Sequence, residues 1–121
     1  LIVVVIIGIL AAIAIPKFSS AREKAYFSAM KSDLKNLATQ QEVYYSGGEY
    51  TYTDDEEALG FVASDGVYVD IQDVSQQGWA AVATHAALES GLGCAIYFGT
   101  ATLTGAPVTP TQQGVVACKE K

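Results

Sequence analysis

Residues 1–15 read LIVVVIIGILAAIAI, a stretch without any charged, hydroxyl or amide side chain, and it decides the fold. As a helix it is roughly 22 Å long, short of the roughly 20 residues that cross the hydrocarbon core of a bilayer. The chain opens on Leu1 without an initiator Met or a flanking charge, so we expect further residues upstream. A helix that is apolar on every side must be buried in lipid or among other proteins. The rest of a 121-residue chain is too small to enclose it, so lipid or other copies of the chain are its expected surroundings.

Two simpler interpretations of this stretch are the core of a signal peptide and an ordinary membrane anchor. A signal peptide is removed and does not lead directly into a long helix, whereas this stretch continues into one. The anchor therefore stays open as an alternative.

The apolar stretch ends at Pro16-Lys17-Phe18. Pro16 cannot donate a hydrogen bond to the carbonyl of Ala12, and its ring crowds that turn. Gly8 adds a second weak point. We therefore expect a helix break at Gly8 and Pro16, with helical hydrogen bonds lost between them when copies assemble.

An apolar helix with Gly and Pro at this spacing, followed at once by an amphipathic helix, resembles the N-terminus of type IV pilins and of type II secretion pseudopilins. The resemblance covers residues 1–18, LIVVVIIGILAAIAIPKF. It implies an α+β fold, in which a long N-terminal helix, first apolar and then amphipathic, packs on a small antiparallel sheet. Members of this superfamily begin a few residues earlier with a methylated Phe and carry a Glu shortly after it, and neither residue is present here.

The same resemblance implies a homopolymer, a helical filament on the cell surface, whose subunits wait in the inner membrane as single-pass proteins. A prepilin peptidase and the pilus assembly machinery are then the implied partners. The positive-inside rule applied to Lys17, Arg22 and Lys24 would instead place the head in the cytoplasm, and an external disulfide would decide between the two orientations. The residues expected in the filament core are Leu1, Ile2, Val3, Val4, Val5, Ile6, Ile7, Ile9, Leu10, Ile13 and Ile15.

The length suits one domain, divided into a long helix at residues 1–46 and a head at residues 47–121. Within the helix, residues 1–16 form the membrane or filament-core part and residues 17–46 the amphipathic part. The net charge is −6 and the pI near 4.5. No nucleic-acid partner is expected, because nucleic-acid surfaces carry a basic stripe.

Residues 17–45 show helical periodicity, with no Pro or Gly between Lys17 and Ser46. Gly47-Gly48 then gives a strong stop signal. The charged residues Arg22, Lys24, Lys31, Asp33 and Lys35 lie largely off the apolar face. The stripe expected to pack the helix against the head is Phe27, Met30, Leu34, Leu37, Gln41 and Tyr44.

Residues 47–60 resemble the segment of short pilins that joins the long helix to the sheet, which implies that Tyr50 and Leu59 fasten it to the head. Its four consecutive acids, Asp54, Asp55, Glu56 and Glu57, are candidate calcium ligands because carboxylates suit a hard cation. The EF-hand spacing is absent, however, and a solvated loop is the alternative. A helix start capped by Thr53 also fits, since a helix N-terminus favours negative charge.

The remaining sequence predicts an antiparallel sheet. Alternation over residues 67–72 and again over Trp79–Thr84 indicates two strands, and Cys94–Phe98 indicates a third. Residues 100–114 are rich in Thr, Pro, Gly and Gln and predict a surface loop. Val115–Cys118 then returns as a short edge strand.

The two cysteines, Cys94 and Cys118, are not in a CxxC pair, and the chain has one histidine. A four-ligand zinc site is therefore excluded within one chain. One disulfide in an oxidising compartment is the simpler expectation, and two free thiols are the alternative.

Motifs of catalysis and cofactor binding are absent from the sequence: GxSxG, HExxH, a P-loop and GxGxxG do not occur. His85 has Glu89 and Ser90 near it in sequence, but nothing places a nucleophile beside it. We therefore expect neither an enzyme nor a cofactor.

The favoured hypothesis is a structural pilin subunit that polymerises through its apolar helix. The alternatives are a type II secretion pseudopilin, a membrane-anchored binding module and a conductive filament subunit. The last rests on the aromatic residues near the helix and the following loop, whose simpler role is packing. They are Phe18, Tyr26, Phe27, Tyr44, Tyr45, Tyr50 and Tyr52.

Overall fold

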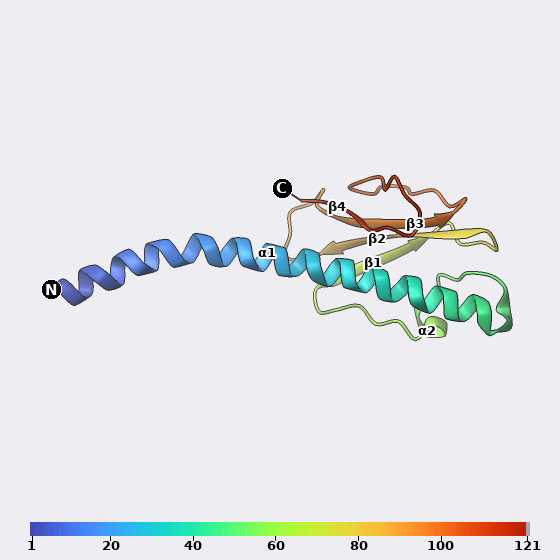
Figure 1. Cartoon of the computed structure of the whole chain (residues 1–121), viewed down its shortest axis with the longest axis horizontal. Coiled ribbons are helices and arrows are strands. Elements are labelled where there is room, and N and C mark those ends of the chain that lie inside the picture. Colours follow the sequence, from blue (N-terminus) through green and yellow to red (C-terminus); the bar gives the residue numbers. More distant parts are fainter. Residues whose placement is uncertain (121) are drawn as a thin grey trace.

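A computed structural model describes residues 1–120, apart from the side chains of residues 13–20, and shows one long helix beside a four-stranded sheet (Figure 1). This confirms the α+β class and the antiparallel sheet expected from the sequence. The elements in chain order are α1 (Ile2–Tyr44), η1 (Tyr45–Glu49), α2 (Glu56–Leu59), β1 (Val67–Gln72), β2 (Gly78–His85), β3 (Gly93–Gly99) and β4 (Ala117–Lys119).

Helix α1 is continuous from Ile2 to Tyr44, so the break expected at Gly8 and Pro16 is not present in the backbone of this single chain. A proline removes one hydrogen bond but leaves the turns on either side intact. In an isolated helix no neighbour competes for those backbone groups. The side chain of Pro16 lies outside the described part of the structure.

The C-terminal end of α1 also differs from the expected end near Ser46. The α-helix stops at Tyr44, and one π-helical turn, η1, continues to Glu49. Gly48 has a φ of 114° within this turn, a conformation that glycine adopts at little cost. The Gly47-Gly48 pair therefore terminates the helix by widening its last turn.

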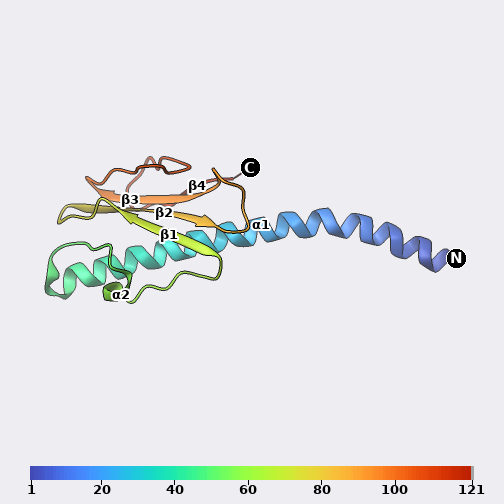
Figure 2. The same ribbon diagram turned by 180° about the vertical axis from the view of Figure 1, so that it is seen from behind.

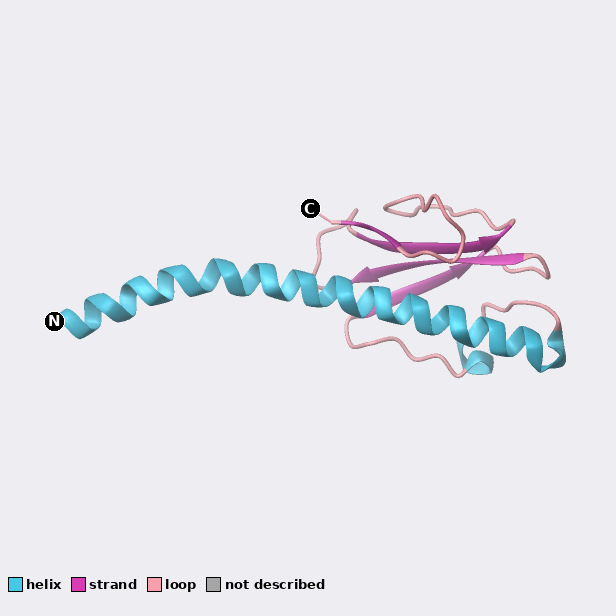
Figure 3. Ribbon diagram, viewed as in Figure 1, coloured by secondary structure: helices cyan, strands magenta, loops and turns pink. Residues whose placement is uncertain are grey.

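The sheet is antiparallel throughout, with the strand order β1-β2-β3-β4 (Figure 3). Every strand predicted from the sequence is present, although β4 begins at Ala117, two residues later than expected. In the register, Cys94 of β3 lies directly opposite Cys118 of β4. These two cysteines, in the middle of the β3–β4 pairing, form the disulfide expected from the sequence.

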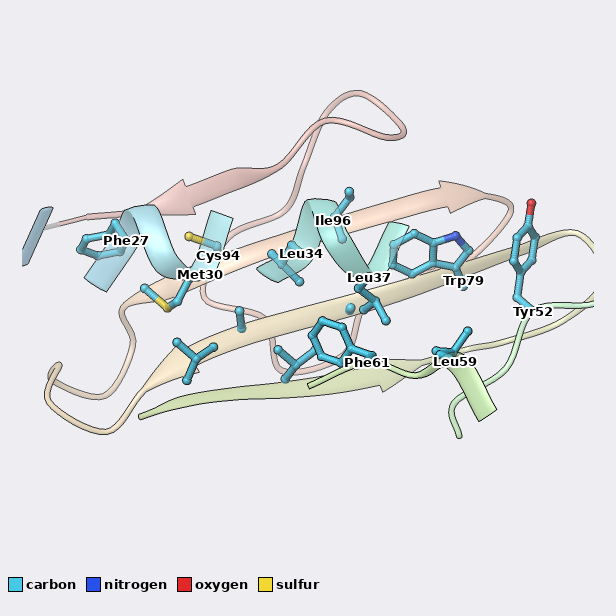
Figure 4. Packing of buried hydrophobic residues seen from close by; sticks show 14 residues of the cluster. Phe27, Met30, Leu34, Leu37, Tyr52, Leu59, Phe61, Trp79, Cys94 and Ile96 are labelled. Carbon is cyan, nitrogen blue, oxygen red and sulfur yellow. The ribbon is translucent and has the colours of Figure 1, made fainter. Parts of the chain in front are cut away.

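The core lies between α1 and one face of the sheet (Figure 4). Met30, Leu34 and Leu37 of the predicted stripe are fully buried, and Phe27 is 3% exposed. Tyr44 is half-buried at the end of the stripe. The sheet meets them with side chains on one face of each strand, among them Val69, Trp79, Ala81, Ala83 and Ile96.

The opposite face of the sheet is covered by residues 100–116, which form more than the simple surface loop that was expected (Figure 3). Ala80 and Ala95 point to this face and are fully buried, and Pro110 of the loop is buried as well. Two backbone N–H groups of the loop, from Thr102 and Thr104, donate to the side chains of Asp73 and Gln72. The loop therefore acts as a second covering layer.

The disulfide gives the first prediction. Replacing both cysteines, Cys94→Ala with Cys118→Ala, should lower the free energy of unfolding by about 3 kcal/mol, because the bond closes a long loop in the unfolded chain. Urea titration of the detergent-solubilised full chain measures the difference.

A mass measurement supplies the control. Wild-type protein alkylated under denaturing conditions without reductant should gain no mass. Alkylation of both thiols would show that the disulfide is absent.

Candidate functional site

The first part of α1 is an apolar helix with no protein around it. We call residues 1–12 the arm; it projects away from the sheet, and only the later part of α1 lies against the strands (Figures 1 and 2). All twelve residues are exposed. The Leu, Ile and Val side chains of the arm are 51–105% exposed: Leu1, Ile2, Val3, Val4, Val5, Ile6, Ile7, Ile9 and Leu10.

The remaining predicted core residues, Ile13 and Ile15, lie outside the described side chains. At Gly8 an added Cβ would meet nothing within 4 Å, so the glycine leaves a notch on the arm. Within the part of the chain that the structure describes, no helix combines the length and the apolar character needed to cross a membrane.

The arm carries no group that can donate, accept or transfer a proton through a side chain, so its chemistry is limited to apolar contact. Exposed apolar surface on this scale marks a binding surface. A helix that is apolar on every side also offers contact in every direction, rather than along one stripe.

The head holds α1 through polar contacts as well as through the core. Gln41 is fully buried, and its side-chain amide both donates to the carbonyl of Thr53, at 2.6 Å, and accepts from the Thr53 N–H, at 3.1 Å. The side chain thus pairs with one residue of the connecting segment as a neighbouring β-strand would. This fixes residues 50–55 against the last turns of α1.

Asp33 makes a second contact of this kind. Its side chain is 4% exposed, although the sequence placed it off the buried stripe. The two carboxylate oxygens accept hydrogen bonds from the Ser64 N–H and hydroxyl, both at 2.9 Å. Hydrogen bonds to a charged group compensate for the cost of its burial, so Asp33 can serve as the anchor of the segment before β1.

The tyrosine that fastens the connecting segment is Tyr52, not Tyr50 as expected. Tyr50 ends η1 in the left-handed region, with a φ of 55°, and is 63% exposed. Tyr52 is 7% exposed, stacks on Tyr45 at 4.9 Å between ring centroids, and donates its hydroxyl hydrogen to Glu42 Oε1. Leu59, the other expected fastener, is 5% exposed and belongs to the core.

The Tyr52 hydroxyl has a raised pKa of about 12, against an ordinary value of 10.0. Burial of the ring is the largest cause, followed by the hydrogen bond to Glu42 and the negative charge of that carboxylate. Burial and a nearby negative charge both disfavour the phenolate.

The four consecutive acids form the start of α2. The cap is Asp55, whose carboxylate accepts from the Glu57 and Ala58 N–H groups, and not Thr53 as expected. Thr53 instead accepts from the Asp55 N–H. Among the described residues no group of three or more His, Cys, Asp or Glu side chains is arranged to hold a metal ion, and this includes the calcium candidates Asp54, Asp55, Glu56 and Glu57.

His85 lies at the end of β2, where its ring stacks on Tyr26 of α1 at 4.1 Å between centroids. Its Nδ1 accepts a hydrogen bond from the Ala87 N–H. An added Cβ at Gly66 would fall within 2.9 Å of the imidazole, so the ring also packs on that backbone. These contacts link β2 to α1 and fix the orientation of the ring.

Sequence reasoning missed two features. The first is a cavity of about 280 Å³ between β3 and the covering loop, lined by Tyr97, Leu103, Pro110 and their neighbours. The second is the contribution of Phe98 to the aromatic residues near the end of the helix, so that Tyr50, Tyr45, Tyr52 and Phe98 follow one another at 4.9–6.1 Å between centroids. A signal for the covering loop exists in the sequence, because residues 79–83 are apolar on both faces of the strand.

Comparison of the sequence with known protein families and with curated proteins finds no match.

The raised pKa of Tyr52 gives the second prediction. Because the native state holds this proton more tightly than the unfolded chain, its contribution to stability is complete below pH 10 and is lost as the pH rises through 12. We expect the free energy of unfolding of the wild type to fall between pH 9 and pH 11 by more than that of Tyr52→Phe. Urea titrations at the two pH values measure the difference.

Tyr50→Phe is the matched control, since Tyr50 is exposed and close by. It should keep the pH dependence of the wild type. Equal pH dependence in wild type and Tyr52→Phe would contradict the role given to the Tyr52 proton.

Proposed function

We propose that this chain is a structural subunit of a type IV pilus-like surface filament, built as a homopolymer through the arm. The observation that carries the proposal is the exposure of nine Leu, Ile and Val side chains on a helix that leads out of a packed head. Side chains of this kind gain roughly 1.5–3 kcal/mol each when they leave water. The arm of one copy is an apolar partner of the same length for the arm of another.

Before assembly the arm belongs in the inner membrane, and its transfer to a filament exchanges lipid for protein. Lipid tails are as apolar as the arm, so the gain must come from close packing of helices, repeated along the polymer. Extraction of each subunit requires work, which the resemblance assigns to a pilus assembly machine. The head carries the contacts with the surroundings, and its disulfide suits an oxidising compartment.

The geometry of the chain supports a polymer without a fixed number of subunits. The arm projects from one end of the head, and the two ends of the molecule differ (Figure 2). Contacts between unlike surfaces of identical copies are heterologous, and they build open helical filaments where the rotation does not close.

The test is electron microscopy of material sheared from cells that produce the protein, with mass spectrometry of the subunit. Long filaments composed of this chain support the proposal. A short fibre that stays in the periplasm would indicate a pseudopilin, and no fibre at all would leave a membrane-anchored binding module. Conductivity of purified fibres free of haem proteins tests the conductive alternative.

The arm gives the third prediction. Ile6→Lys should reduce the yield of filaments by about tenfold or more, because a charge in the middle of an apolar bundle is costly to bury. Quantitative immunoblots of the sheared fraction measure the yield, and unchanged circular dichroism of the purified chain shows that the head is folded.

Two control variants accompany it. Ile6→Leu keeps the arm apolar, and Val115→Lys places the same charge on an exposed residue of the head, 52% accessible. Both should assemble like the wild type. Assembly of Ile6→Lys at the wild-type level would exclude the arm as the polymer contact.

The continuous α1 of the single chain gives the fourth prediction. In the filament, the segment from Gly8 to Pro16 should lose helical hydrogen bonds. Pro16 has no backbone N–H to donate to Ala12, so packing against neighbouring subunits can extend the backbone most easily there. A filament reconstruction at side-chain resolution tests this. Unbroken bonds from each N–H to the carbonyl four residues earlier, through Ala12, would refute it.

A further inference from the structure

Two groups of opposite charge, one on α1 and one on the head, form no ion pair with each other in the described part of the chain. The first, the lysine row, consists of Lys24, Lys31 and Lys35, which are exposed on α1. The second, the acidic segment, is Asp54–Glu57, also exposed. Within the described part of the chain, no lysine of the row forms an ion pair with an acid, and the only carboxylate of the segment that is engaged is that of Asp55, in the cap of α2.

The lysine row lies along one line of the helix surface. Its members are seven and four residues apart, which returns them to the same side of an α-helix. Glu42 follows seven residues later on the same line, but its carboxylate accepts a hydrogen bond from Tyr52. The row is therefore a basic strip on the exposed side of α1.

The acidic segment lies on the other flank of α1. Asn36 and Gln40 line a hollow together with Gly60–Val62, and Glu56 lines another with Val67–Val69 of β1. Lys31 and Asn36 are five positions apart, as are Lys35 and Gln40, so the two flanks are separated by about 140° around the helix axis. The two groups therefore lie on different flanks of α1, and no ion pair joins them in the described part of the chain.

We propose that the lysine row of one subunit contacts the acidic segment of a second copy, and that this contact sets how neighbouring heads dock in the assembled filament. The inference rests on the proposed function, because packing of the arms brings heads together at high effective concentration. Opposite charges on opposite flanks make the contact heterologous, so each head contacts one neighbour with its lysine row and another with its acidic segment.

Charge complementarity favours a second copy of the chain as the partner that binds to the lysine row of α1. The face presents three lysines, followed by Glu42, which already accepts a hydrogen bond from Tyr52, and the same molecule carries four acids in one short segment. Individual exposed ion pairs are weak and are screened by salt. Their main effect is to select the register of docking and to disfavour like-charged arrangements.

The test is a charge reversal in the full chain, read as the yield of sheared filaments. Lys31→Glu with Lys35→Glu, and separately Glu56→Lys with Glu57→Lys, should each lower the yield by about tenfold at low salt, where such contacts are strongest. The two pairs combined in one chain restore the net charge of −6. The combined variant should also restore most of the yield.

The matched control reverses two other exposed charges, Lys119→Glu and Asp70→Lys, one at a time and together. These variants should assemble like the wild type. If the reversed lysine and acidic pairs behave like these controls, or if the combined variant fails to recover, the inference is overturned.

A second measurement identifies the contact directly. Filaments grown from mixed isotope-labelled and unlabelled chains are treated with a zero-length carbodiimide, which joins a lysine amine to a carboxylate it touches. Peptides that join Lys31 or Lys35 to Glu56 or Glu57 should contain one labelled and one unlabelled half. Cross-links of the lysine row to other acids alone would refute the contact.

The outcomes separate this inference from the proposed function. If the wild type forms no filament, the proposed function fails. If the wild type assembles and the reversals have no effect, only the docking contact fails. If the lysine reversal instead weakens binding of the unassembled chain to anionic vesicles and leaves the filament yield unchanged, the row binds lipid headgroups and the inference is wrong.

Discussion

A helix with apolar side chains on every side cannot be satisfied by a single neighbouring surface, and this constraint shapes the whole molecule. The head covers only one stripe of α1, from Phe27 to Tyr44, and leaves the arm uncovered. The same helix is therefore a core element at one end and a bare apolar rod at the other. A head large enough to enclose the arm would have left it no exposed apolar surface.

The sheet of the head packs against α1 on one face and against the loop of residues 100–116 on the other. Alanines at positions 80, 81, 83 and 95 keep the middle of the sheet thin, so α1 approaches one face and the loop of residues 100–116 approaches the other. Larger side chains, such as Trp79 and Ile96, fill the spaces left along α1. Around this apolar contact, Gln41 attaches the connecting segment and Asp33 attaches the segment before β1, each through hydrogen bonds. The head is thus anchored to one half of the helix by both apolar and polar contacts.

Much of the head was predictable from the sequence because periodicity reports burial directly. The spacing of Met30, Leu34 and Leu37 identified the buried face of α1, and alternation identified the strands. Two of the expectations that were wrong depend on local geometry instead. Tyr50 and Tyr52 are chemically equivalent in sequence, and only the left-handed turn at Tyr50 decides which ring is buried. Asp33 has the appearance of a surface residue until Ser64, 31 positions later, supplies its hydrogen bonds.

The position of the covering loop, residues 100–116, affects which parts of the sequence can vary in evolution. It lies on the side of the sheet away from α1 (Figure 2), and Cys94–Cys118 ties its end to β3. In any assembly held together by the arms, residues around Thr104 and Thr111 would form the outermost skin. Substitutions there would alter what the environment encounters and leave the helix contacts untouched. In the proposed filament, the contacts that hold the polymer and the surface that it presents outward would be encoded in opposite ends of the chain, so that each could diversify without disturbing the other.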